Sequence, residues 1–169
     1  MKKLPIAGLT VLLLFILAGC DLFAVKDTST EPPQLVVLTE SGRIRAQRFG
    51  FQWETSATSV IADSVDPRTY AYEPIRVTAG ETLQLAYEEG KAPQVFTLWF
   101  YPGGEEERIA VSYELNRGGD DPRFAEDAVA LFEVSESGVY VVEALWPSWV
   151  KDGINGEAFY GFAVSVEPQ

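Results

Sequence analysis

The sequence has no histidine and only one cysteine, Cys20, among its 169 residues. Without histidine, the chain has no imidazole to act as a general base, as a member of a nucleophilic triad or as a metal ligand. A single cysteine forms no intramolecular disulfide and supplies no thiolate set for zinc or blue copper. The sequence also lacks a glycine-rich phosphate loop between a strand and a helix, which argues against a nucleotide site.

Basic residues are scarce as well. The chain has 13 Lys and Arg residues against 25 Asp and Glu residues, a formal net charge of −12 at pH 7. Nucleic-acid binding depends on Lys and Arg side chains that neutralise phosphates, whereas this chain has an excess of acidic residues. We therefore expect no nucleic-acid partner and a surface that repels anionic lipid headgroups. Cationic partners and divalent ions are compatible with this charge.

Cys20 follows the apolar run Leu9–Ala18, which itself follows Lys2 and Lys3. A short positive start, an apolar core and small residues before a cleavage point are the layout of an export signal. The run is shorter than the about 20 residues that a membrane-spanning helix needs. Leu17-Ala18-Gly19-Cys20 closely resembles the lipobox of bacterial lipoproteins. An ordinary signal peptide with a chance cysteine and a short uncleaved anchor are the alternatives.

The lipobox resemblance implies cleavage before Cys20 and a diacylglyceryl thioether on its sulfur. We expect a signal peptide over residues 1–19 and a lipid-anchored tether over 20–34, which contains the polar and proline-rich Thr28–Pro33. Residues 35–169 are then a single β-sandwich domain on the outer, extracytoplasmic face of the cell membrane. A chain of this length buries about 68–70% of its unfolded surface, enough for a core without disulfides.

Short runs of β-branched and aromatic residues alternate with glycine and proline turns along the expected domain. Only residues 121–130 have the pattern of a short helix, with Pro122 in its first turn. Many strands at short spacing, without a long helical period, indicate an all-β sandwich. The expected strands are 35–38, 43–49, 58–62, 75–77, 82–87, 94–101, 109–114, 128–134, 139–146 and 158–166.

Four residues of these strands resemble the immunoglobulin-like framework. By that resemblance, Tyr87 and Val142 stand where two disulfide cysteines would be, and Trp99 takes the place of the buried tryptophan on the central strand. Tyr140 would be the tyrosine corner, with its ring inside and its hydroxyl bonded to backbone upstream. The expected fold class is therefore an all-β, immunoglobulin-like antiparallel β-sandwich without a disulfide.

A second resemblance covers most of residues 43–166. The segments Arg48–Trp53, Val77–Glu81 and Gly138-Val139-Tyr140 follow one another in an order similar to small uncharacterised lipoproteins of low-GC Gram-positive bacteria. Those proteins have a Gly-x-Tyr-x-Trp element, and this chain has Phe51 in place of the tyrosine. The resemblance implies a fold and a location, and it carries no activity.

Carboxylates are the groups left for catalysis. A glycoside hydrolase needs only two of them across a cleft. With 25 acidic residues, some pair lies at a suitable separation in almost any fold, and runs such as Glu105–Glu107 fall in expected turns. Charge runs of this kind are usually solvated. We expect no enzyme, with a carboxylate-dependent glycoside hydrolase as the alternative.

Calcium is the one candidate for a bound ion, because it takes several hard oxygen ligands from loops. Asp120, Asp121, Glu126 and Asp127 lie within eight residues, and the segment from Asp152 to Glu157 has oxygen ligands around two glycines. Neither follows the ligand order of an EF-hand, and a solvated acidic loop is the alternative. No other cofactor is expected.

The segment Trp146-Pro147-Ser148-Trp149 enters the turn between the last two expected strands. Loops at the ends of sandwiches often carry recognition residues, and an exposed tryptophan stacks on a sugar ring or anchors a peptide. Trp149, Trp146 and Lys151 are therefore candidate ligand-binding residues. Trp146 ends an apolar strand, and Trp149 has the alternative of folding back over the sandwich edge.

These patterns together predict a lipid-anchored extracytoplasmic binding or interaction module. Its partners would be the membrane, through the lipid on Cys20, and a protein or cell-wall component. The alternative is a non-catalytic accessory subunit of a membrane or cell-envelope complex. An exposed apolar patch along one sheet would favour that alternative.

Overall fold

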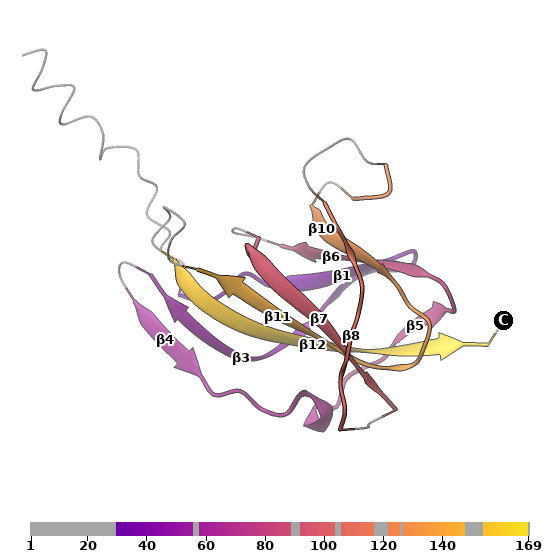
Figure 1. The fold of residues 1–169 in the computed structure, drawn as a ribbon, viewed down its shortest axis with the longest axis horizontal. Helices are drawn as coiled ribbons and strands as arrows, with labels where there is room; N and C mark the ends of the chain where they lie inside the picture. Colours follow the sequence, from indigo (N-terminus) through magenta and orange to yellow (C-terminus); the bar gives the residue numbers. More distant parts are fainter. Residues whose placement is uncertain are drawn as a thin grey trace, which may run out of the picture.

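The computed structural model describes residues 30–55, 58–88, 92–103, 106–116, 122–125, 127–147 and 154–168. The expected signal peptide, Cys20 and most of the tether lie outside the described residues. In the described part, two β-sheets pack face to face, and the one short helix is the 3-10 turn η1 (Pro67–Thr69) (Figure 1). None of the helices in that part is long and apolar enough to cross a membrane.

The smaller sheet, sheet A, has five strands in the order β2-β1-β6-β10-β9, and every neighbouring pair is antiparallel. Its first two strands form a hairpin, and β6 in the centre pairs with β1 on one side and β10 on the other. The bounds are β1 Leu35–Thr39, β2 Gly42–Arg45, β6 Thr82–Tyr87, β9 Glu114–Leu115 and β10 Ala128–Glu133.

The larger sheet, sheet B, has seven strands in the order β4-β3-β12-β11-β7-β8, with β5 placed beside β12. The 13-residue strand β12 pairs antiparallel with β3 through its first half and parallel with β5 through its second half. The bounds are β3 Gln47–Glu54, β4 Ser59–Ala62, β5 Ile75–Thr78, β7 Val95–Pro102, β8 Ile109–Ala110, β11 Gly138–Trp146 and β12 Asn155–Glu167.

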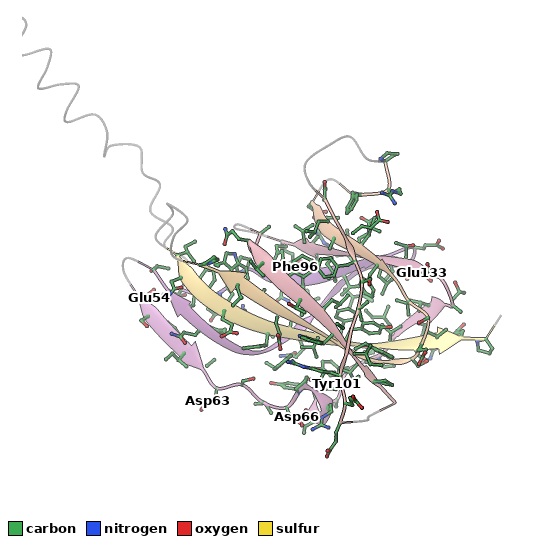
Figure 2. The ribbon with its side chains drawn as sticks, in the orientation of Figure 1. Glu54, Asp63, Asp66, Phe96, Tyr101 and Glu133 are labelled. Carbon is green, nitrogen blue, oxygen red and sulfur yellow. The ribbon has the colours of Figure 1, made fainter. Side chains whose placement is uncertain are left out.

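The core lies between the two sheets and consists of side chains that alternate along each strand. Leu83 and Leu85 of sheet A are buried against residues such as Phe96 and Leu98 of sheet B, and Figure 2 shows Phe96 between the sheets. Alternation with period two is what a sheet with one buried face requires. The prediction of an all-β sandwich without a disulfide is confirmed.

Tyr140 forms the predicted tyrosine corner. Its hydroxyl donates a hydrogen bond to the Glu136 carbonyl at 3.3 Å, and its ring stacks on Phe162 with centroids 5.6 Å apart. The ring is buried, so the side chain ties the turn before β11 to the core. The immunoglobulin-like feature is therefore present although the chain has no cysteine pair.

Trp99 does not occupy the core, and that prediction was wrong. Phe96, Leu98 and Phe100 point inward from β7, so the pleat turns Trp99 to the outer face. There the Arg108 guanidinium lies 4.0 Å from the ring centroid. The core tryptophans are instead Trp53 and Trp146, whose rings meet edge to face with centroids 5.1 Å apart.

Two predicted strands are each divided between the sheets. The run 43–49 contains the end of β2 and the start of β3, which are separated by the buried corner residue Ala46. The run 109–114 supplies β8 to sheet B and the first residue of β9 to sheet A. Hydrophobic periodicity does not show where a chain changes sheet, because both sides of the corner keep the same pattern.

The helix predicted over residues 121–130 is absent from the described residues of that segment. Residues 122–124 make turns and a bend, and β10 begins at Ala128. The Gln84 side chain holds this segment over the outer face of sheet A, because its amide donates to the Arg123 carbonyl and accepts from the Ala125 N–H. A tertiary clamp therefore replaces the local helix.

Residues 63–74, which we call the strap, cross the outer face of sheet B and contain η1. The Val65 N–H donates to the Phe49 carbonyl at 3.2 Å. A Cβ at Gly50 would lie 2.7 Å from the Ser64 Cα, closer than atoms pack. Glycine at position 50 is therefore required for the strap to lie against the sheet.

Alkaline pH is expected to unfold the domain through its buried tyrosines. Burial raises the pKa of Tyr140 to about 12 and the pKa of Tyr87 well above its ordinary value. An unfolded tyrosine has a pKa of about 10. The stabilisation is complete below pH 10 and is lost as the pH rises from 10 through the folded-state values, because only the unfolded chain releases these protons.

The measurement is tyrosinate absorbance at 295 nm together with circular dichroism between pH 9 and pH 13. We expect the buried tyrosines to ionise together with the loss of near-ultraviolet dichroism. Complete ionisation of all seven tyrosines near pH 10 with the fold intact would contradict the burial seen here.

Candidate functional site

The predicted recognition loop lies between β11 and β12, and the structure describes its two ends. Trp149 and Lys151 lie outside the described residues. Trp146 is 2% exposed and packs against Trp53 and Tyr87, so its side chain is in the core and not on a surface offered to a ligand. Pro147 and Asn155, on either side of this loop, line an open groove on sheet B.

The groove has a volume of about 350 Å³, within the range of small-ligand and peptide sites. Strands β7, β11, β12 and β3 all contribute to it. Its lining residues are Gln52, Val95, Leu145, Pro147, Asn155, Gly156 and Glu157.

Five side chains form a continuous row across sheet B, which we call the outer row. Strand pairing places Val95 opposite Leu145, Leu145 opposite Glu157, Glu157 opposite Gln52, and Gln52 opposite Ile61. Directly paired residues share one face of a sheet, so all five point outward. Three of them are apolar and exposed: Val95 at 47%, Leu145 at 39% and Ile61 at 69%.

The floor of the groove is fixed by the core beneath it. A Cβ at Gly156 would lie 2.3 Å from the Trp53 ring, so only glycine lets that ring pack against the inner side of β12 at this point. Trp146, next to Leu145 in the chain, holds Trp53 from the other side. A site built on paired strands over packed aromatic rings keeps its shape better than a site on a loop.

The polar groups around the groove are amides and carboxylates. Asn155 donates from its side-chain amide to a Glu54 carboxylate oxygen at 3.4 Å, and Glu157 stands in the middle of the outer row. The groove lining identified among the described residues includes no Lys or Arg. The groove therefore suits an apolar ligand that is neutral or positively charged.

A second groove, of about 500 Å³, lies on the outer face of sheet A. Its walls include Glu114 and Arg123, which form an ion pair at 2.8 Å, and Gln84, which clamps the segment above. This groove is larger, but these polar groups on its walls already bond to one another or to the segment above and are therefore not free to bind a ligand. The groove on sheet B has the exposed apolar side chains that binding sites use.

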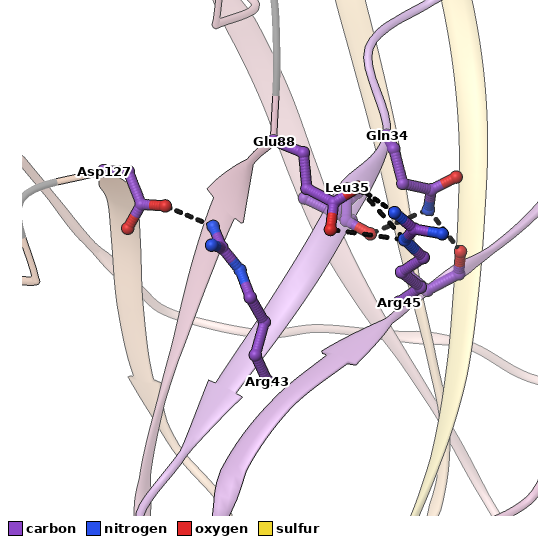
Figure 3. Close-up of polar contacts among 7 residues, drawn as sticks. Gln34, Leu35, Arg43, Arg45, Glu88 and Asp127 are labelled. Atoms are coloured by element: carbon purple, nitrogen blue, oxygen red, sulfur yellow. Dashed lines mark hydrogen bonds and ion pairs between the residues drawn. The ribbon is translucent and has the colours of Figure 1, made fainter.

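The predicted calcium residues are only partly described. Asp120, Asp121 and Glu126 lie outside the described residues. Asp127 forms an ion pair with Arg43, and both side chains are close to half exposed (Figure 3). Across the described ranges, no three acidic, histidine or cysteine side chains gather into a possible metal site. Asn155 and Glu157, from the second acidic segment, belong to the groove.

Many described carboxylates are paired with arginine. The Arg68 side chain and backbone N–H donate to Asp66 and hold the pKa of that exposed carboxyl at about 2. A carboxyl with so low a pKa stays ionised at neutral pH and does not donate a proton. The ion pairs are Arg43–Asp127, Arg45–Glu88, Arg48–Glu31, Arg68–Asp66, Arg108–Glu143 and Arg123–Glu114.

Comparison of the chain with protein-family models, with curated proteins and with solved structures finds no match. The sequence pattern predicts the loop between β11 and β12 but not the groove beside it. The sequence feature that could have predicted the groove is Leu145. It is an apolar residue at an outward position of β11, between the buried residues Ala144 and Trp146.

Calcium is expected to leave the stability of the domain unchanged. The Asp127 carboxylate is occupied by Arg43, and a ligand that binds only the folded state would raise the melting midpoint. Thermal unfolding with 1 mM or more calcium and with a chelator measures this. A higher midpoint with calcium, lost in the variant Asp120→Asn/Asp121→Asn, would show that the acidic segment binds the ion.

Proposed function

We propose that this protein is a lipid-anchored extracytoplasmic binding module that holds its partner at the groove on sheet B. The observation that carries the proposal is the groove itself, in which the apolar side chains of Val95 and Leu145 lie beside polar groups on a paired sheet. Val95 and Leu145 are direct neighbours on paired strands, and exposed apolar side chains grouped at a groove are typical of binding sites. The export signal and Cys20 support the location.

The tether enters the domain at the same end of the sandwich as the groove. The Tyr160 hydroxyl of β12 donates to the Pro33 carbonyl at 2.6 Å, and Arg48 of β3 donates to the Pro32 carbonyl at 2.8 Å. Glu157 of the outer row is three residues before Tyr160 on the same strand. Figure 1 shows β1 and β12 starting from the same side of the molecule.

This placement brings the groove close to the lipid anchor. The ten Cα–Cα steps from Cys20 to Thr30 span at most about 35 Å when fully extended. A partner at the groove is then a component of the membrane surface or of the adjoining envelope. An anchored acidic domain is also repelled by anionic headgroups, which keeps its surface available to proteins and wall components.

An accessory subunit of a membrane complex is the second candidate, and the outer row favours it. Val95 and Leu145 side by side, with Ile61 exposed on the edge strand β4, give this face apolar side chains of the kind that a permanent subunit interface covers. A carboxylate-dependent hydrolase has less support, because acidic side chains such as Glu143 and Asp66 are held in ion pairs with arginine.

Replacing Cys20 tests the location. Cys20→Ala is expected to release the protein from the membrane fraction or to leave an uncleaved precursor, because alanine has no sulfur to which the lipid could be attached. Mass spectrometry of the wild-type N-terminus is the direct measurement. An unlipidated mature terminus on the wild-type protein would remove the anchor from the proposal.

Position-specific crosslinking tests the groove. A photoreactive benzophenone residue at position 145 is expected to give a defined product in intact cells, because Leu145 lies in the groove. The control is the same photoreactive residue at position 109. Ile109 is 53% exposed on β8, and its partner on β7 is Phe100, five residues further along that strand than Val95. The mass of the product distinguishes a protein subunit from a wall polymer, and identical products from both positions would contradict the proposal.

A further inference from the structure

Strand β4 ends sheet B, and among the described residues only β3 pairs with it. The other edge of a terminal strand presents its N–H and C=O groups to solvent, which is a template for another strand. We propose that this edge of β4 pairs with an extended segment of a partner protein that is apolar in its centre and basic at its ends. This goes beyond the groove and depends on neither the groove nor the lipid anchor.

The other edge strands carry features that discourage such pairing. In β2, Arg43 and Arg45 are charged and are engaged by Asp127 and Glu88 (Figure 3). Strand β5 carries Arg76, while β8 and β9 are only two residues long each. Charged residues and short length are the usual protections of natural edges.

Strand β4 is four residues long, as β2 and β5 are, but it lacks their charged residues. Ser59, Val60, Ile61 and Ala62 contain no charge and no proline, and the register with β3 runs without a bulge. Val60 and Ile61 are β-branched residues, which favour a strand. Ile61 has the highest exposure among the exposed large apolar side chains of the described residues.

Ile61 also gives the added strand a side chain to contact. It ends the outer row, so a residue paired with Ile61 from a new strand would extend the row by one position. Apolar and β-branched residues pair best with an isoleucine at such a position. The centre of the partner segment is therefore expected to be apolar.

Carboxylates lie near both ends of β4, with Asp63 directly after the strand and Glu54 one strand inward on β3. Glu54 pairs with Ser59 at the start of β4, and Asp63 follows Ala62 at its end; Figure 2 labels both at opposite ends of the strand. A Lys or Arg of the partner segment beside Ala62 would meet Asp63. One at the other end would be attracted at longer range by Glu54, which accepts from Asn155 on the β12 side. The net charge of −12 also favours a basic partner at long range.

A second copy of this chain fits the edge less well. In an antiparallel β4–β4 pair the start of one strand faces the end of the other, which brings Asp63 of one copy toward Glu54 of the other. Like charges at both ends of a four-residue ladder oppose the pairing, and four residues extend only about 13 Å. The strap begins at Asp63 and turns onto the outer face of sheet B, so it does not lengthen the edge.

Synthetic peptides test the proposal on the mature lipidated protein in detergent. The probe is fluorescent, capped Lys-Val-Thr-Val-Thr-Lys, and the matched control has Glu in place of both Lys residues. A third peptide carries N-methyl groups on alternate residues, which removes the donors of one edge. By anisotropy at low salt, we expect the Lys-ended peptide to bind about tenfold more tightly than the Glu-ended one and the N-methylated peptide to lose binding.

Two variants locate the site. Ile61→Lys places a charge on the edge and is expected to weaken the Lys-ended peptide about tenfold. Val65→Lys makes the same change of charge on an exposed residue beyond the strand and is expected to change binding by no more than about twofold. Both side chains are exposed, so both variants are expected to fold.

Absence of binding by the Lys-ended peptide, or binding that survives N-methylation or Ile61→Lys, would overturn the proposal. So would self-association of the wild-type protein in analytical ultracentrifugation that Ile61→Lys abolishes, because a second copy would then occupy the edge. Crosslinking from position 145 tests the groove independently of the peptide experiment. A negative result for peptide binding at β4 therefore leaves the proposed binding at the groove standing.

Discussion

The backbone pairing of β12 is the constraint on which the rest of the structure depends. This 13-residue strand pairs on one side with β11, and on the other side with β3 and then with β5. A central strand leaves few backbone groups without a partner, so it is the least replaceable part of a sheet. Because the chain has no disulfide, β3 and β4 are held to the remainder of sheet B chiefly by this ladder and the core, with the strap bonded to Phe49.

Aromatic packing then joins the two sheets at the end where the groove lies. Tyr87 belongs to sheet A, and its ring meets Trp146 and Tyr160 of sheet B at centroid distances of 5.9 and 6.1 Å. Edge-to-face contacts of this kind add to the burial of the rings. The same cluster includes Trp53, against which Gly156 closes the groove floor. The contacts that stabilise the sandwich therefore also shape its candidate binding surface.

Most of the strands and the fold class follow from period-two alternation and turn residues, as in β6, whose predicted and observed bounds agree at Thr82 and Tyr87. The errors have tertiary causes. Trp99 was assigned to the core by resemblance, whereas its neighbours Leu98 and Phe100 take the inward positions. The sequence pattern predicted a single strand over residues 43–49. The structure has two strands there, because the chain turns from one sheet to the other at Ala46.

The sequence by itself determined which side-chain chemistry is missing: with no histidine and one cysteine, the chain has no imidazole site and no multi-cysteine metal site, whatever the fold. It also determined the strand pattern, because alternation is a local property of the chain. Only the tertiary structure decided the outer row and the exposed edge at β4. Val95, Leu145, Glu157, Gln52 and Ile61 come from five strands, and their alignment depends on pairing register between distant segments, which local sequence does not encode.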